Sequence, residues 1–328
     1  MKTFSEYKNT PKNLSVKESA AQQYTLFPKD TGELKQMIKE EIKKQGFEAD
    51  LNHIDVSKIT DFSELFKESE FNGDISKWDV SNATCMKKMF FFAHKFNRDI
   101  SKWNVSKVID MSSMFKDASN FDMDISMWDV GNVTNMSCMF WYASAFDQDI
   151  SDWDVSNVKD MNHMFTYAES FNQDLSGWDV SSVENMDRMF YGAGSFNGDI
   201  STWDVRNVKN MSGMFSNSAF NSNLKRWNTK NVENMSFMFH NAESFNQDLS
   251  RWDVSNVKDM NYMFQNAKSF NQDLSRWDVS NVTYMEYMFQ NAKSFNQDLS
   301  RWDVSKVEYA SAVFENCPCP EEYMPRFK

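Results

Sequence analysis

A tryptophan recurs along most of this chain at a nearly constant interval. Successive members lie 25 positions apart, except for one interval of 24 between Trp203 and Trp227. The series consists of Trp78, Trp103, Trp128, Trp153, Trp178, Trp203, Trp227, Trp252, Trp277 and Trp302. A fixed period of roughly 20–50 residues is the sequence signature of a solenoid. The spacing therefore predicts a stack of similar coils, each of which contacts only its neighbours.

Two segments of each unit predict its local structure. In the unit that begins at Phe245, apolar residues from Val257 to Ala267 fall at offsets 0, 3, 6, 7 and 10, which predicts a short helix over residues 256–267. The preceding segment DLSRWDV, residues 248–254, suits a brief strand and a tight bend. These patterns predict an α/β solenoid of about eleven coils of 24–25 residues, with a parallel strand and a helix in each coil and right-handed crossovers.

The predicted packing also has a consequence for shape. Parallel strands stack about 4.8 Å apart, whereas packed helices need about 8–10 Å. A coil with a strand on one side and a helix on the other should therefore bend the stack into an arc, with the strands inside. If the segments are only single narrow turns, the arc should flatten.

The ends of the chain differ from the repeats. Residues 1–29 are polar and without a period, and we expect a flexible lead. Asp30 and Glu33 form a capping box, and Gly46 stops the pattern, which predicts a helix over residues 30–46 that caps the stack. Repeats occupy residues 47–319, and residues 320–328 should form the C-terminal cap because prolines end the pattern.

Composition excludes several classes of protein. The formal net charge is −12, which disfavours direct binding to nucleic acid or to an anionic membrane. No apolar run approaches the roughly 18–20 residues that span a bilayer. The N-terminus lacks an apolar signal core, and we expect a cytoplasmic monomer.

Aspartates recur at two positions of the unit. The first row consists of Asp74, Asp99, Asp124, Asp149, Asp174 and Asp199, and the second of Asp79, Asp129, Asp154, Asp179 and Asp204. Stacked carboxylates repel one another unless each accepts hydrogen bonds, so we expect them to cap backbone N–H groups at two bends. A ladder of calcium ions is the alternative, although the glycine-rich calcium-binding nonapeptides are missing.

The unit pattern FNxDISxWDVSNVxxMxxMFxxA resembles the BspA-like leucine-rich repeats of bacterial surface proteins, which also occur in mycoplasma lipoprotein-associated proteins. The resemblance covers residues 47–319. It implies a leucine-rich-repeat-like solenoid that binds other proteins or host surfaces, and it brings no catalytic residues.

Candidate binding residues lie where the units differ. The position before tryptophan becomes a cationic column in four successive units, and aromatic residues recur at positions near the methionines. The candidate partner-binding residues are Arg226, Arg251, Arg276, Arg301, Phe237, Tyr262, Tyr287, Trp141 and Tyr142. Aromatic and arginine side chains are typical interface anchors. The arginines could instead belong to a surface lattice neutralised by nearby aspartates, and the aromatics could simply pack on adjacent coils.

Enzymatic activity is not expected. The four histidines lie in different units, and the chain has neither a phosphate-binding loop nor a cluster of metal ligands, so no cofactor is predicted. The leading hypothesis is a curved scaffold that binds an unidentified protein partner. Alternatives are an acidic nucleic-acid mimic that inhibits a DNA-binding protein, a surface adhesin exported by a non-standard route, and a self-assembling structural protein.

Overall fold

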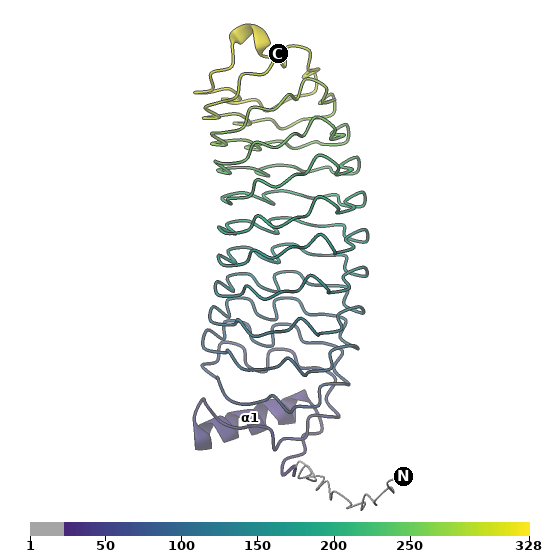
Figure 1. Cartoon of the computed structure of the whole chain (residues 1–328), viewed down its shortest axis with the longest axis vertical. Coiled ribbons are helices and arrows are strands. Elements are labelled where there is room, and N and C mark those ends of the chain that lie inside the picture. The colour runs from purple at the N-terminus through teal and green to yellow at the C-terminus, as the bar shows by residue number, and fades with distance from the viewer. Residues whose placement is uncertain (1–22) are drawn as a thin grey trace, which may run out of the picture.

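The computed structural model describes residues 23–328. Its coils stack as one column, with helix α1 (Thr31–Gln45) across one end and the C-terminus at the other (Figure 1). The repeat solenoid expected from the tryptophan spacing is therefore present.

Like side chains meet in the core of the column. The repeated phenylalanines, tryptophans and methionines are buried. The rings of Trp203 and Trp227 lie 6.2 Å apart and 3° from parallel, although their sequence interval is one residue short. Each tryptophan also bonds to the preceding coil, as Trp178 does through its indole N–H to the carbonyl oxygen of Ile150 at 2.9 Å. Stacking and this hydrogen bond together hold the coils in register.

The predicted helix over residues 256–267 is wrong. Apart from α1 and the short 3₁₀ helix η1 (Glu321–Tyr323), no helix is assigned within residues 23–328. Consecutive β-turns occupy the segment instead: Met263 N–H donates to the Met260 carbonyl, and Ala267 N–H to that of Phe264. Tyr262 and Asn266, the third residues of these turns, have φ of 60° and 58°, as type II turns require.

The turns leave alternate N–H groups free to bond between coils. The N–H groups of Met260, Tyr262, Phe264 and Asn266 donate to carbonyl oxygens of the next coil at 2.8–2.9 Å. Each backbone donor of the segment thus has a partner without a helix. This pairing explains why a helical apolar spacing can occur in a non-helical chain.

The strand prediction for residues 248–254 is also wrong in place and extent. From Asp61 onward, each coil carries an isolated parallel bridge at a position after these residues, and the first coils add the bridges Leu26–Ile54 and Asp50–Asp74. The bridges join Asp61, Cys85, Asp110, Asn135, Asp160, Asn185, Asn210, Asn234, Asp259, Tyr284 and Tyr309 in series. The column consequently shows no marked arc in Figure 1, because no helical layer is thicker than the bridged side.

The aspartate rows cap bends, as expected. Asp174 Oδ1 accepts the N–H of Ser176 at 2.8 Å, and Asp179 Oδ1 accepts that of Ser181 at 2.9 Å. Equivalent hydrogen bonds from the backbone N–H groups of Ser151 and Ser201 lower the pKa of Asp149 and Asp199 below the ordinary value of an aspartate. The carboxylates thus stay charged while they hold the bends.

The two ends are covered differently. Asp30 caps α1 by accepting the N–H of Glu33, whereas the Glu33 carboxylate reaches back to the N–H of Lys29. Leu34 and Ile38 of α1 are buried against the first coil. At the other end, Leu299 N–H donates to the carbonyl of Tyr323 in η1.

Residues 1–29 were expected to form a flexible lead, and residues 1–22 of it lie outside the described residues. Its remaining part is not free, because the N–H groups of Thr25 and Leu26 donate to the His53 carbonyl and Leu26 forms a parallel bridge with Ile54. The chain is therefore already joined to the stack before α1 begins.

A candidate binding surface on the turn face

The turn segments of successive coils form one face of the column, which we call the turn face. Three outward positions of each turn segment build it: the first turn column lies two residues after the first methionine, the middle column follows the core phenylalanine, and the second turn column comes next. In the coil of residues 260–267 these are Tyr262, Gln265 and Asn266. The first and second turn columns have positive φ in every repeat from Lys88 and Phe92 onward, which directs them outward in the same way.

Aromatic side chains stack along these columns. Phe237 lies 4.5 Å from Tyr262, and Tyr262 lies 4.9 Å from Tyr287, measured between ring centroids. Trp141 and Tyr142 lie on the same face, where Tyr142 stacks on Tyr167 at 4.6 Å and is 42 % exposed. The predicted aromatic residues thus pack on adjacent coils and still present an edge to solvent.

A groove of about 400 Å³ interrupts this surface. Its lining comprises Trp141, His163, Thr166, Tyr167, Arg188, Tyr191, Ser216, Phe237 and His240. Pockets for small ligands typically have about 300–1,000 Å³ and aromatic walls with a few polar groups. The groove therefore has the size and lining of a binding site.

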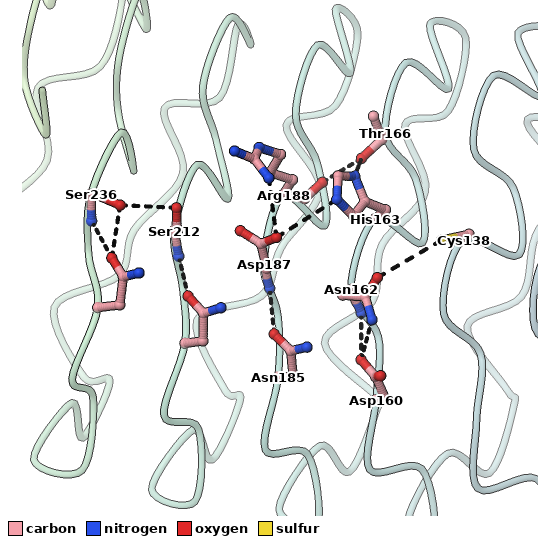
Figure 2. Close-up of polar contacts among 12 residues, drawn as sticks. Cys138, Asp160, Asn162, His163, Thr166, Asn185, Asp187, Arg188, Ser212 and Ser236 are labelled. Carbon is pink, nitrogen blue, oxygen red and sulfur yellow. Dashed lines mark hydrogen bonds and ion pairs between the residues drawn. The ribbon is translucent and has the colours of Figure 1, made fainter.

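Hydrogen bonds fix the polar side of the groove (Figure 2). The Thr166 hydroxyl donates to the Arg188 carbonyl, so it accepts from His163 Nδ1, which lies 3.2 Å away. His163 Nε2 lies 3.6 Å from Asp187 Oδ2, which also accepts from Arg188 Nη1 at 3.3 Å. The carboxylate of Asp187 thus lies between a histidine and an arginine.

Burial sets the charge of the two groove histidines. It lowers the pKa of His163, although the Asp187 carboxylate acts in the opposite direction. It also lowers the pKa of His240, whose Nδ1 lies 3.1 Å from the hydroxyl of Ser216. Both histidines are therefore neutral at pH 7.

A lysine covers the tryptophan at one end of the groove. Lys116 Nζ lies 3.4 Å from the centroid of the Trp141 ring, and Trp141 stacks on His163 at 4.4 Å. Burial lowers the pKa of Lys116, yet an ammonium group so close to a ring keeps a cation–π contact. The Trp141 indole N–H is buried and has no hydrogen-bond partner in the described part of the chain.

The arginine column lies elsewhere. Arg226, Arg251, Arg276 and Arg301 are exposed, and none of them lines the aromatic groove. Arg276 and Arg301 instead border a hollow of about 430 Å³ with Asp273 and Asp298. Hydrogen bonds lower the pKa of both aspartates: for Asp273 the Ser275 N–H contributes most, and for Asp298 the Ser300 hydroxyl does. The charges of Arg276 and Arg301 lower both pKa values further. The structure thus divides the predicted residues between two surfaces.

Sequence reasoning missed the groove itself. Arg188, His163 and His240 were not among the candidates, although each occupies a variable outward position. The available signal was glycine: Gly192 and Gly213 stand in the two turn columns, where other coils carry side chains.

Within residues 23–328, no group of three acidic, cysteine or histidine side chains is placed to bind a metal ion. Nor does that part contain a helix of the length and apolarity that crossing a membrane requires.

Comparisons with known proteins give one family match. The sequence matches the family described as "Mycoplasma protein of unknown function, DUF285" over residues 33–137, 123–227 and 216–324. No curated protein matches it.

Two solved structures show weak similarity. One is the crystal structure of a TLR13–ssRNA13 complex, with 10 % sequence identity to this chain and a TM-score of 0.28. The similarity covers 88 % of this chain and 35 % of the other, so this chain spans about a third of that protein's length. A leucine-rich-repeat protein of Leptospira interrogans has 6 % identity and a TM-score of 0.21, over 74 % of this chain and 78 % of the other.

Proposed function

Because the chain belongs to the Mycoplasma protein family of unknown function DUF285, we propose its role from its own geometry: it is a non-catalytic scaffold that binds a protein partner. The observation that carries this proposal is the turn face, on which Phe237, Tyr262 and Tyr287 stack and remain partly exposed. Stacked aromatics that are held by the fold lose little freedom on binding, and such residues dominate interface energies.

The resemblance to BspA-like repeats supports the same role. Repeat units of that kind serve in contacts with other proteins or host surfaces, and a straight column offers a long, regular face for such a contact. We include cell-surface adhesion within the proposal as one setting in which the turn face would act.

The arginine column is a second candidate contact. Arg226, Arg251, Arg276 and Arg301 present four cations along one line of an otherwise acidic protein. Their proximity to Asp273 and Asp298 favours a neutralised surface lattice. We therefore assign the main contact to the turn face and treat the arginine column as an auxiliary strip.

The proposed function can be tested by capturing partner proteins from the native cell with the wild-type chain and then with variants. The double variant Tyr262→Ser plus Tyr287→Ser should lose the captured partner, while its circular dichroism spectrum stays that of the wild type. Arg251→Glu plus Arg276→Glu should retain the partner unless the arginine strip is the true contact. Retention by both double variants would contradict binding through either surface.

A nucleic-acid mimic is the competing function. One oxygen of Asp174 and of Asp179 accepts a bend N–H, and the equivalent bond lowers the pKa of Asp149 and Asp199. A mimic should compete with DNA for a bound enzyme in a salt-sensitive manner. If the captured partner is a DNA-binding protein that DNA displaces, this function replaces the scaffold assignment.

A further inference from the structure

The groove marks a break in the aromatic stacking of the turn face. Along the first turn column, His163 and Phe237 carry rings, whereas Arg188 and Gly213 stand between them. A Cβ atom at Gly213 would lie 3.0 Å from Cγ of Arg188, so the arginine side chain leans across the glycine. The position of Gly213 is thus the one level of this column without a side chain of its own.

The second turn column breaks at the adjacent coil. Gly192 follows Tyr142 and Tyr167 in that column, and a Cβ atom there would lie 2.5 Å from the Tyr167 ring. Tyr167 therefore leans over Gly192 and meets Tyr191 edge-on at 5.2 Å. The two breaks lie in adjacent coils, and the side chains that border them, Tyr167, Arg188 and Phe237, line the groove.

The size of the break suits a flat group. Three coil steps of about 4.8 Å separate the ring levels of His163 and Phe237, which leaves about 14 Å between them. Arg188 accounts for part of this distance, and its side chain is 43 % exposed. The Arg188 side chain leans across Gly213, so a ring inserted at this level requires the flexible arginine to swing aside. The ring would then contact Phe237 on one face and the displaced guanidinium of Arg188 on the other, a contact that arginine favours.

The turn segments around the groove carry more basic than acidic residues, which favours a ligand with negative charge. In the seven turn segments from 86–93 to 235–242, four residues are basic and two are acidic, although the whole chain has a net charge of −12. The basic residues are Lys87, Lys88, Lys116 and Arg188, and the acidic ones are Asp117 and Asp187. Lys116 and Lys88 both lie within 5.6 Å of the Phe91 ring centroid. An anionic ligand would find its complement here and repulsion on the aspartate rows.

We propose that the groove binds an aromatic side chain carried by an acidic segment of a protein partner. This inference rests on the proposed scaffold function and names the chemistry of its ligand. The aromatic side chain restores the interrupted stack, and the flanking carboxylates lie along the basic turn segments toward Lys116. The aromatic ring would supply most of the binding free energy, and the charges would set the orientation of the segment.

A nucleobase could also fill the gap, but a nucleic acid is disfavoured. Its phosphates would need a continuous basic track, because electrostatic contacts dominate its affinity. The turn segments after Arg188 carry no lysine or arginine as far as Ala292. A short acidic peptide needs only the few cations that are present.

Binding of labelled dodecapeptides to the full chain tests the proposal by fluorescence anisotropy. The probe carries one tryptophan among glutamates and aspartates, and its controls are the same peptide with alanine for tryptophan, a Trp-containing peptide with serines for the acids, and an oligothymidylate. The acidic tryptophan peptide should bind at least tenfold more tightly than each control. Equal binding of the alanine peptide, or tighter binding of the oligothymidylate, would overturn the proposal.

Matched variants locate the site. Phe237→Ala should weaken the tryptophan peptide at least tenfold, whereas Tyr287→Ala, which removes a stacked ring of the same column outside the groove, should change binding less than twofold. Arg188→Glu alters a half-exposed side chain and should weaken binding without unfolding the coil, which covers the case in which Phe237→Ala disturbs the fold. Equal effects of Phe237→Ala and Tyr287→Ala would contradict the assignment to the groove.

The two proposals fail differently. If no peptide binds, yet the native partner is lost on Tyr262→Ser plus Tyr287→Ser, the groove inference is wrong and the scaffold function stands. If the acidic tryptophan peptide binds through Phe237 and no native partner depends on the turn face, the groove inference stands and the scaffold function is wrong.

Discussion

The indole N–H of Trp178 donates a hydrogen bond to the carbonyl oxygen of Ile150, 28 residues earlier, at 2.9 Å. The same carbonyl accepts the backbone N–H of Trp153 at 3.2 Å. One buried oxygen thus joins a turn within its own coil to the side chain of the next. Equivalent bonds recur for all ten tryptophans of the series.

This bond predicts the effect of Trp178→Phe. The variant keeps an aromatic ring in the stack but loses the donor and some buried area, so the free energy of unfolding should fall by about 1–2 kcal/mol. Urea unfolding followed by circular dichroism measures the change. Met127→Ala, at a side chain that is 84 % exposed, should have almost no effect, and an equal loss in both variants would contradict this role for the indole N–H.

The tryptophan spacing was sufficient to predict the stack, because only coils of constant length place Trp178 above Trp153 at each step. It was not sufficient to predict the coil. Inward residues of consecutive β-turns recur every three or four positions, so Met260, Met263 and Phe264 have the same spacing in a turn segment as on a helix. The distinguishing property, positive φ at Tyr262 and Asn266, is favoured by asparagine but not by tyrosine.

The candidate site could be predicted only in part for a related reason. Phe237, Tyr262 and Tyr287 stand out by residue type and share one column, so their exposure on a common face followed from the period. The groove depends on which neighbours lean across Gly192 and Gly213. That arrangement joins residues of different columns and coils, and the repeat pattern does not specify it.

The bends make a second prediction. Asp273 Oδ1 accepts the N–H of Ser275 at 2.8 Å, and this bond is the first cause of its lowered pKa. Asp273→Ala should lower the free energy of unfolding by about 1 kcal/mol at pH 7, as at helix N-caps. Asp273→Asn retains the acceptor oxygen and should cost much less. Equal losses in the two variants would mean that charge, rather than the bend hydrogen bond, matters at this position.

Protonation of His163 should make the free energy of unfolding depend on pH. Burial lowers its pKa in the folded chain, so the unfolded chain binds more protons at mildly acidic pH. The resulting stability is fully present above the ordinary histidine pKa of about 6.5 and is lost as the pH falls through the folded value. The charged groups that influence His163 are Asp187, Arg188, Lys116 and Asp160.

NMR titration of the His163 ring checks this prediction. Its pKa should lie below 6.5 in the wild type. In Asp187→Asn it should fall further, because the favourable carboxylate has been removed and Arg188 and Lys116 remain. Arg188→Gln should shift it upward. A His163 pKa that does not respond to Asp187→Asn would contradict the proximity of the two side chains at 3.6 Å.

The glycines of the groove make the last prediction, and one control lies two residues away. Gly192 has φ of 66° and Gly213 has φ of 60°, and an added Cβ would lie 2.5 Å from the Tyr167 ring at the first and 3.0 Å from Arg188 Cγ at the second. Gly192→Ala should therefore lower the free energy of unfolding by about 1–2 kcal/mol, through backbone strain and displacement of Tyr167. Gly213→Ala should cost less, because a flexible arginine can move. Gly194, with no atom within 4 Å of an added Cβ, should tolerate alanine.

Thermal unfolding should rank the variants Gly192→Ala, Gly213→Ala and Gly194→Ala from least to most stable. A reversed order would mean that Tyr167 does not lean over Gly192, and the groove would then lose one wall.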